Sequence, residues 1–168
     1  MIHDLFPSDT SRNSLLAAQK RVAESVIVKD EFSKIRMIAG VDQAFIDDTI
    51  ISGIVVLRYD SFEIVERVHS IQHATYPYIP TFLSFREGEI IVNTCRKLNT
   101  TPDLLMVDGA GINHPRKAGI ASHVGVALDL PTIGITKRIL CGSGKEPINV
   151  GEATPLFYKN QGNTLYLL

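Results

Sequence analysis

The residues best suited to chemistry are concentrated between Leu104 and Lys137. Four apolar residues there run directly into Asp108, and glycines follow at Gly109 and Gly111. A short apolar run with a proline before it and glycines after it predicts a buried strand. A carboxylate at the end of such a strand, followed by a glycine-rich loop and a helix, lies where open α/β sheets bind their ligands.

Basic side chains surround this acid in the sequence. The loop adds His114, Arg116 and Lys117, and the next strand-like run ends at Lys137. The formal net charge of the chain is only −1. The positive charge is therefore a local feature, and an acid, a histidine and several cations at one sheet edge are typical of a site that handles phosphate.

Length and composition predict one globular domain over residues 1–168. The chain is 45% hydrophobic and 21% charged, which excludes a disordered protein. Cys95 and Cys141 lack the spacing of a metal or redox motif, so we expect two free thiols in a reducing compartment. The first residues do not resemble a signal peptide, and no apolar stretch approaches the roughly 20 residues that cross a bilayer. We expect a soluble, cytoplasmic protein without a membrane partner.

Periodicity and turn residues predict the order of the elements. Helices are expected at 11–28, 87–98 and 119–128, and strands at 35–45, 49–59, 62–70, 104–107 and 132–136. The first three strands are expected to form an antiparallel meander, and Tyr76–Pro80 a rigid loop, because its two prolines exclude helix. Residues 156–158 and 164–168 could pair across 160–163. This order predicts an α/β, ribonuclease-H-like mixed sheet flanked by helices.

That layout would bring three acids together. Asp42 and Asp108 lie on strands that are neighbours in it, and Glu87 would stand in the first turn of the helix between them. Carboxylates that converge without matching cations repel one another, so they stay ionised only if a metal neutralises them. All-oxygen ligands favour Mg²⁺ or Mn²⁺. Two such ions about 3.5–4 Å apart can activate water and stabilise the leaving oxygen of a phosphodiester.

Other residues could assist, although each has a simpler structural interpretation. His114 and Lys137 could supply a proton relay or a cation, and the glycine amides could approach a backbone closely. Alternatively, the aspartates cap turns, Glu87 favours a helix N-terminus, His114 caps the loop backbone and Lys137 is solvated. The remaining candidate histidines are expected to be structural or on the surface: His69, His73 and His123.

Three blocks of the sequence resemble the endonuclease V family. They read IAGVDQAF, YPYIPTFLSFREG and DLLMVDGAGINHPRKAGIASHVGVALDLPTIGITK. The third block is long and specific, and the similarity runs from the first helix to about Gly151. This family consists of deoxyinosine-directed nucleases with a ribonuclease-H-like fold. The resemblance implies hydrolysis of the second phosphodiester 3′ to the deaminated base.

The resemblance also implies roles for individual residues. Metal-binding acids would be Asp42, Glu87 and Asp108, and catalytic partners His114 and Lys137. A strand-separating wedge would consist of Pro77, Tyr78, Ile79 and Pro80, with the tyrosine in the place of the displaced base. Gly109 and Gly111 would line a pocket that reads hypoxanthine through the backbone. Arg86 and Arg116 complete the expected substrate contacts. The implied cofactor is Mg²⁺ or Mn²⁺, and the implied partner of the monomeric protein is DNA with deoxyinosine or RNA with inosine.

The sequence departs from the family pattern in two places, and other functions stay open. Gln43 stands where many members carry an apolar residue. The family usually continues after a segment like NTLYLL with an SPGHR-like stretch and another helix that brings a histidine near the metals. We expect the protein to lack that segment. One alternative is therefore a catalytically weak protein that binds inosine-containing nucleic acid, and another is a different ribonuclease-H-like nuclease, such as a junction resolvase.

Overall fold

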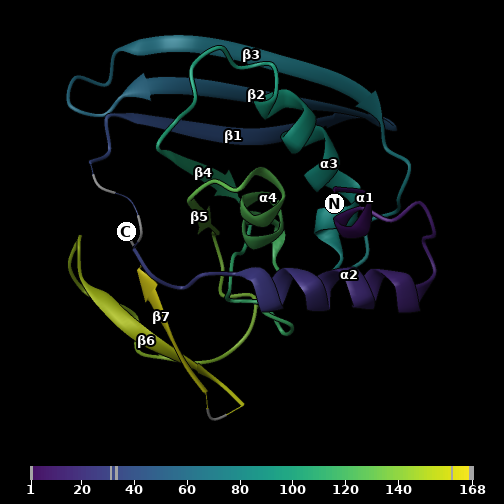
Figure 1. Ribbon diagram of the computed structural model, residues 1–168. Coiled ribbons are helices and arrows are strands. Elements are labelled where there is room, and N and C mark those ends of the chain that lie inside the picture. Colours follow the sequence, from purple (N-terminus) through teal and green to yellow (C-terminus); the bar gives the residue numbers. More distant parts are fainter. Residues whose placement is uncertain (1, 31, 33, 160, 167–168) are drawn as a thin grey trace.

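A five-stranded mixed sheet forms the centre of the computed structural model, which describes residues 2–30, 32, 34–159 and 161–166 (Figure 1). Its strands are β1 (Met37–Ile46), β2 (Thr49–Arg58), β3 (Ile64–His73), β4 (Leu104–Asp108) and β5 (Thr132–Ile135). The spatial order is β3-β2-β1-β4-β5. β1 to β3 form an antiparallel meander, while β4 and β5 run parallel to β1. The predicted ribonuclease-H-like mixed sheet with helices is confirmed.

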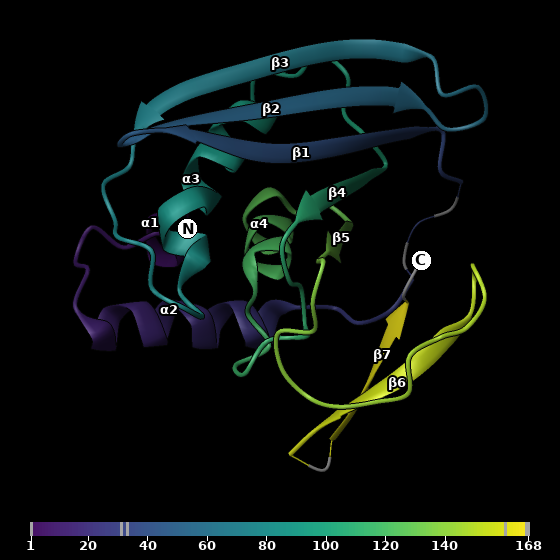
Figure 2. The ribbon, with the colours of Figure 1, turned by 180° about the vertical axis from the view of Figure 1, so that it is seen from behind.

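The helices form two further layers on one side of the sheet. They are α1 (Ile2–Leu5), α2 (Arg12–Ser25), α3 (Leu83–Cys95) and α4 (Ile120–Leu128). α3 and α4 lie directly against the sheet, and α2 crosses on their far side (Figures 1 and 2). In the part of the chain that the structure describes, no helix covers the opposite face of β1 to β3 (Figures 1 and 2).

Strand alternation explains this one-sided arrangement. In β2 the residues Ile50, Ser52, Ile54 and Val56 are buried, and their neighbours between them face the other side. Successive side chains of a strand point to opposite faces, so one face of β2 joins the core under α3. The central apolar cluster is completed by side chains from β1, β4, α3 and α4.

Several boundaries differ from the sequence prediction. α2 ends at Ser25 rather than 28, because Val26 adopts an extended backbone. β3 continues to His73, since it pairs with β2 along its whole length. α1 was not expected at all. It is held by the side chain of His123, whose Nε2 lies 2.8 Å from the carbonyl oxygen of Leu5.

The start of α3 is the difference that matters for the site. α3 begins at Leu83, so the prediction that Glu87 stands in its first turn is wrong. Charge at the helix N-terminus does not determine this boundary. Instead, the loop before the helix ends at Thr81, whose φ is positive at 69°. Phe82 then occupies the N-cap position, where no side chain makes a capping hydrogen bond. α3 also ends earlier than predicted, at Cys95.

A two-stranded hairpin follows the sheet. β6 (Ala153–Tyr158) pairs with β7 (Gln161–Tyr166), and Tyr158 is opposite Gln161. The hairpin was predicted, but its turn is tighter than the expected 160–163, because residues from 161 onwards already belong to β7. The end of the predicted second strand, 167–168, lies outside the described residues. None of the helices described here is both long and apolar enough to cross a bilayer.

Candidate functional site

Two of the predicted acids are neighbours at the carboxyl edge of the sheet. Val41 of β1 pairs with Val107 of β4 in parallel register. The next residue in each strand is an aspartate, Asp42 and Asp108, and both side chains are exposed. Parallel strands end at the same edge of a sheet, so the strand pattern alone places these two carboxylates together.

Glu87 reaches the same edge from α3. Its carboxyl is half-buried, and burial is the main reason why its pKa is raised to about 7. The charge of Arg86 opposes this shift in the pKa, whereas Asp108 and Asp42 add to it. The three predicted acids therefore act on one another electrostatically, as carboxylates do when they are close in a poorly solvated site.

The pKa of Asp108 is affected by a neighbouring negative charge and a neighbouring positive charge. Its pKa is raised, first by burial and then by Asp42, while the ammonium of Lys137 lowers it. Lys137 comes two residues after Ile135, which pairs with Asp108 in β5. The register thus places this lysine beside the acids, as the sequence predicted for a cation at the site.

The acids fit a hard divalent cation by chemistry but do not yet form a complete cage. Carboxylate oxygens are the ligands that Mg²⁺ and Mn²⁺ prefer. Mutual repulsion, seen in the raised pKa of Glu87 and Asp108, is relieved when a cation binds. Among residues 2–30, 32, 34–159 and 161–166, however, no three side chains of His, Cys, Asp or Glu are already arranged to hold a metal ion.

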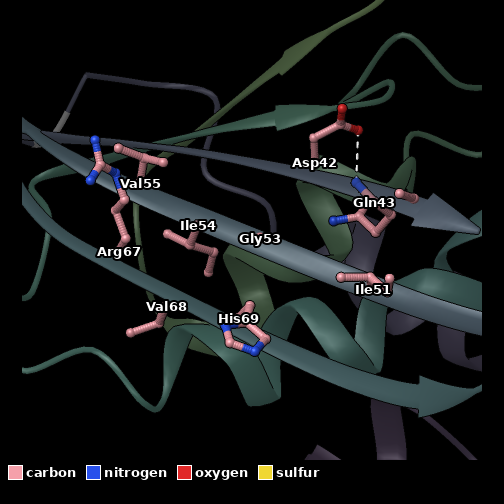
Figure 3. A pocket seen from close by; sticks show the side chains of 10 residues that line it. Asp42, Gln43, Ile51, Gly53, Ile54, Val55, Arg67, Val68 and His69 are labelled. Carbon is pink, nitrogen blue, oxygen red and sulfur yellow. Dashed lines mark hydrogen bonds between the residues drawn. The ribbon is translucent and has the colours of Figure 1, made fainter.

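A shallow pocket of about 470 Å³ extends from Asp42 across the uncovered face of the sheet. Figure 3 shows Asp42 on β1 at one end, with Arg67 and His69 on β3 across the intervening strand. Gly53 of β2 forms part of the floor, and a Cβ there would meet no atom within 4 Å. The Asp42 carboxylate accepts a hydrogen bond from the backbone N–H of Gln43, at 2.7 Å.

The loop after Asp108 is packed so closely that it requires glycine. Gly109 has a φ of 142°, and a Cβ there would lie 2.2 Å from Cγ2 of Ile120. Across from it, a Cβ on Gly134 of β5 would lie 2.4 Å from the carbonyl oxygen of Gly109. The loop after Asp108 therefore packs closely between α4 and β5, and its backbone forms a surface without side chains.

This bare backbone forms one wall of a cavity of about 180 Å³. The predicted wedge loop and the start of α3 also contribute to its lining. The residues around the cavity are Tyr78, Pro80, Thr81, Leu83, Ser84, Gly109, Ala110, His114, Ala118, Gly119, Ile120, Thr136, Arg138 and Leu140. Most are apolar or small and a few are polar, which is the usual composition of a binding site for a small organic group.

His114 is a buried residue of the cavity lining and is held by the backbone on both ring nitrogens. Its Nε2 lies 3.0 Å from the carbonyl oxygen of Thr81, so Nε2 carries the proton. Its Nδ1 accepts hydrogen bonds from the backbone N–H groups of Arg116 and Ala118. Burial lowers the pKa of His114 to about 4. The ring is neutral near pH 7, so the positive charge that acts on Asp108 is that of Lys137.

The two predicted substrate-binding arginines are occupied by protein groups. Arg86 donates a hydrogen bond to the carbonyl oxygen of Tyr76, and Arg116 donates to Thr81. Each guanidinium also lies over an aromatic ring at 4.7 Å, Arg86 over Phe45 and Arg116 over Phe82. A direct role for either arginine in binding substrate stays a prediction.

The sequence identified part of the cavity and missed the rest. Of the predicted wedge, Tyr78 and Pro80 line the cavity, whereas Pro77 and Ile79 lie outside the lining. Gly109 lines it, and Gly111 does not. The lining residues that sequence reasoning missed include Thr81, Ala110, Thr136 and Arg138. The proximity of Arg138 to Lys137 and of Thr81 to Pro80 in the sequence was a usable signal.

Known proteins share this sequence and this structure. Residues 20–167 match the family model described as Endonuclease V. The endonuclease V of Dictyoglomus thermophilum is 50% identical over 129 residues, covering 77% of this chain and 57% of that protein. The crystal structure of endonuclease V from Streptomyces avermitilis superposes with a TM-score of 0.85 at 30% identity, covering 94% of this chain and 70% of that one.

One related structure contains nucleic acid. It is the endonuclease V of Ciona intestinalis in complex with a 24mer DNA containing an inosine followed by a ribo-adenosine. Its TM-score is 0.70 at 29% identity, and the match covers 74% of this chain and 57% of that one. The chain spans less than two thirds of the length of this protein and of the Dictyoglomus relative.

Proposed function

Because the chain belongs to the endonuclease V family, we propose that it is a metal-dependent endonuclease that acts on nucleic acid containing deoxyinosine or inosine. It hydrolyses the second phosphodiester 3′ to the deaminated base and leaves 3′-hydroxyl and 5′-phosphate ends. Such a cut would begin the repair of deaminated DNA. The relative bound to inosine-containing DNA supports this choice of substrate.

One observation carries the proposal: the cavity and the acids share a single loop. Asp108 ends β4 at the acidic edge, and the next residue, Gly109, lines the cavity. A base held in the cavity would thus keep its own backbone beside Asp42 and Asp108. Enzymes that read a base in a pocket must take it out of the stack, and the adjacent acids would then meet the backbone next to it.

The wedge loop would take the place of the extracted base. Tyr78 is 66% exposed and stands at the cavity. Pro77 and Pro80 fix the backbone on both sides of it, and Ile79 accepts a hydrogen bond from the N–H of Phe82 at 2.9 Å. An aromatic ring on a stiff loop can stack on the neighbouring bases. The backbone at Gly109 and Gly111 would read the extracted hypoxanthine.

The chemistry would take place at the acidic edge. Asp42, Glu87 and Asp108 would hold Mg²⁺, or Mn²⁺ in its place. When bound, a divalent cation lowers the pKa of water and neutralises charge on phosphate oxygens. Lys137 would stabilise the negative charge that develops on the phosphate, and His114, held as a neutral ring, would keep the cavity wall in place.

The proposal also includes the setting of the protein. Its nucleic-acid partner is deoxyinosine-containing DNA, with inosine-containing RNA as a second substrate to be compared. It acts as a monomeric single domain over residues 1–168. Cys95 and Cys141 are free thiols, which supports a reducing, cytoplasmic location.

The test is nicking of a labelled duplex that carries one deoxyinosine, in Mg²⁺ or Mn²⁺, beside an undamaged duplex and an RNA version. We expect a single cut one nucleotide beyond the base, absent with EDTA. Asp42→Asn and Asp108→Asn should each reduce nicking by about 10³-fold or more. Each removes a carboxylate charge that would hold the cation, and the cation would stabilise the negative charge that develops on the phosphate. Full activity in both folded variants would refute the proposed site.

A second candidate function is recognition of inosine without cutting. It is favoured by Glu87, whose pKa of about 7 leaves this acid only partly ionised at neutral pH in the free protein. Specific binding of the deoxyinosine duplex, with no cleavage in either cation, would support this candidate over the nuclease.

A further inference from the structure

The wedge loop, defined here as Tyr76–Thr81, is attached to the protein by its two ends. At its beginning, the carbonyl oxygen of Tyr76 accepts a hydrogen bond of 2.6 Å from Nη1 of Arg86. Arg86 belongs to α3, and its guanidinium lies over the ring of Phe45 from β1. This end is therefore tied to both α3 and the sheet.

The other end is held more tightly. The carbonyl oxygen of Thr81 accepts hydrogen bonds from Nε2 of Gln19 at 2.7 Å, Nη2 of Arg116 at 2.9 Å and Nε2 of His114 at 3.0 Å. Nη2 of Arg116 also donates to the hydroxyl of Thr81 at 2.7 Å. One residue thus receives donors from α2 and from the loop before α4.

Gln19 completes this arrangement. It lies on the buried face of α2 with no exposed surface, and both atoms of its amide are used. Oε1 accepts from Nε of Arg116, while Nε2 donates to Thr81. The glutamine therefore orients the guanidinium and holds the loop at the same time. No residue of α2 was assigned to the site by the sequence motifs.

The conformation of Thr81 explains why so many donors converge on it. Its φ of 69° lies in the left-handed region, which is unusual for a β-branched residue. Such a conformation persists only where the surrounding structure holds it in place. Without these hydrogen bonds, Thr81 would relax toward an ordinary backbone conformation, and the direction of the loop would change.

We propose that Gln19, Arg86 and Arg116 are positioning residues that fix the wedge loop at both ends and so hold Tyr78 against the cavity. Prolines at 77 and 80 make the intervening backbone stiff, so fixed ends determine where the tyrosine stands. The effect on recognition rests on the proposed function. The mechanical part, the fixing of the loop, does not depend on what the protein binds.

This role differs from direct phosphate binding by the two arginines. A phosphate contact contributes to all sequences alike and to the salt dependence of binding. A positioning contact acts through Tyr78, so its loss weakens binding only where an altered base is to be extracted. Uncharged Gln19 separates the two cases, because it cannot bind phosphate as a cation.

The mechanical part is tested by hydrogen exchange of backbone amides in the 168-residue protein, followed by mass spectrometry of a peptide that covers the wedge loop. Gln19→Leu should make exchange in this peptide about tenfold faster and leave a peptide from β1 and β2 unchanged. The matched control is Thr94→Val, which removes another buried hydrogen bond from a side chain to the backbone, that of Thr94 to Ile90. Unchanged exchange in Gln19→Leu overturns the proposal.

The recognition part is tested by binding of deoxyinosine and undamaged duplexes without divalent cations. Gln19→Leu and Arg116→Lys should each lose about tenfold in affinity for deoxyinosine and stay within about twofold for undamaged duplex, whereas Thr94→Val should change neither. In Arg116→Gln, the slope of log affinity against log salt should stay as in the wild type. An equal loss for both duplexes, with a slope smaller by about 1, would show a phosphate contact and overturn the positioning role.

The two tests fail separately. If the wild-type protein shows no preference for deoxyinosine, the proposed function is wrong, and hydrogen exchange in Gln19→Leu still decides whether Gln19 fixes the loop. If the wild type shows the preference but Gln19→Leu keeps it in full, the function stands and the positioning role is refuted.

Discussion

Acid should destabilise this protein through His123, a histidine in the core. The ring has no exposed surface and lies 4.6 Å from the ring of Phe6 and 5.3 Å from that of Phe85. Nε2 donates to the carbonyl oxygen of Leu5, and Nδ1 has no partner among the described residues. Burial is the main cause that lowers the pKa of His123 from its ordinary value of 6.5 to about 4.

The direction of the effect follows from linkage. The folded protein keeps His123 neutral down to about pH 4, while the unfolded chain binds a proton below about pH 6.5. The contribution to stability is therefore complete above pH 6.5 and is lost as the pH falls through 4. A difference of about 2.5 units is equivalent to roughly 3 kcal/mol, of which about 2.5 kcal/mol would be lost by about pH 4.5.

His123→Phe isolates this contribution. At about pH 7.5 the variant should be about 1 kcal/mol less stable than the wild type, because the carbonyl of Leu5 loses its donor. At about pH 4.5 it should be more stable by about 1–2 kcal/mol, since only the wild type carries the penalty. Urea unfolding followed by circular dichroism measures both differences, with His69→Phe as a control at an exposed histidine. A constant difference across this pH range would refute the reasoning.

Three further perturbations test the site. Gly109→Ala should lower the free energy of unfolding, measured by urea titration, by about 2–4 kcal/mol. The added Cβ would collide with Ile120, and the φ of this residue favours glycine. Wild-type stability of the variant would contradict the packing described for this loop. Tyr78→Ala should weaken binding of a deoxyinosine duplex by about 10- to 100-fold and leave the melting temperature unchanged, and an unchanged affinity would count against the wedge. Because the pKa of Glu87 is raised in the folded state, the wild-type protein should lose stability as the pH rises from 4.5 through about 7. Glu87→Gln should abolish this loss. After allowance for solvent screening this amounts to about 1–2 kcal/mol at about pH 8 in EDTA, and an equal effect at about pH 4.5 would refute it.

The acids at the sheet edge could be predicted from the sequence because they depend on short-range pattern. Asp42 and Asp108 each follow an apolar run, and the order of elements makes their strands neighbours. Because parallel strands end at the same edge of a sheet, the two carboxylates can be placed together without knowledge of any other contact. Glu87 interacts electrostatically with both aspartates in the structure. Its predicted place in α3 was wrong by about a turn, because the boundary depends on Thr81 rather than on charge.

The fixing of the wedge loop could not be predicted in the same way. It depends on the positive φ of Thr81 and on contacts between residues far apart in the sequence, such as Gln19 and Arg116. The sequence did contain one indication that Gln19 makes buried contacts. Gln19 occurs at the helical spacing of the apolar residues of α2, and a polar side chain on a buried face requires partners there. That requirement shows that partners exist, whereas only the folded structure identifies them.

The wedge loop connects the two halves of the proposed activity. It presents Tyr78 to the cavity, and it leads through Thr81 directly into α3, which carries Arg86 and Glu87. Arg86 binds the beginning of the loop, and its charge opposes the rise that burial causes in the pKa of the adjacent Glu87. A displacement of the loop when a base enters the cavity would therefore also change the environment of the third carboxylate. Recognition of the base and assembly of the acidic site would in this way be coupled through one short segment of the chain.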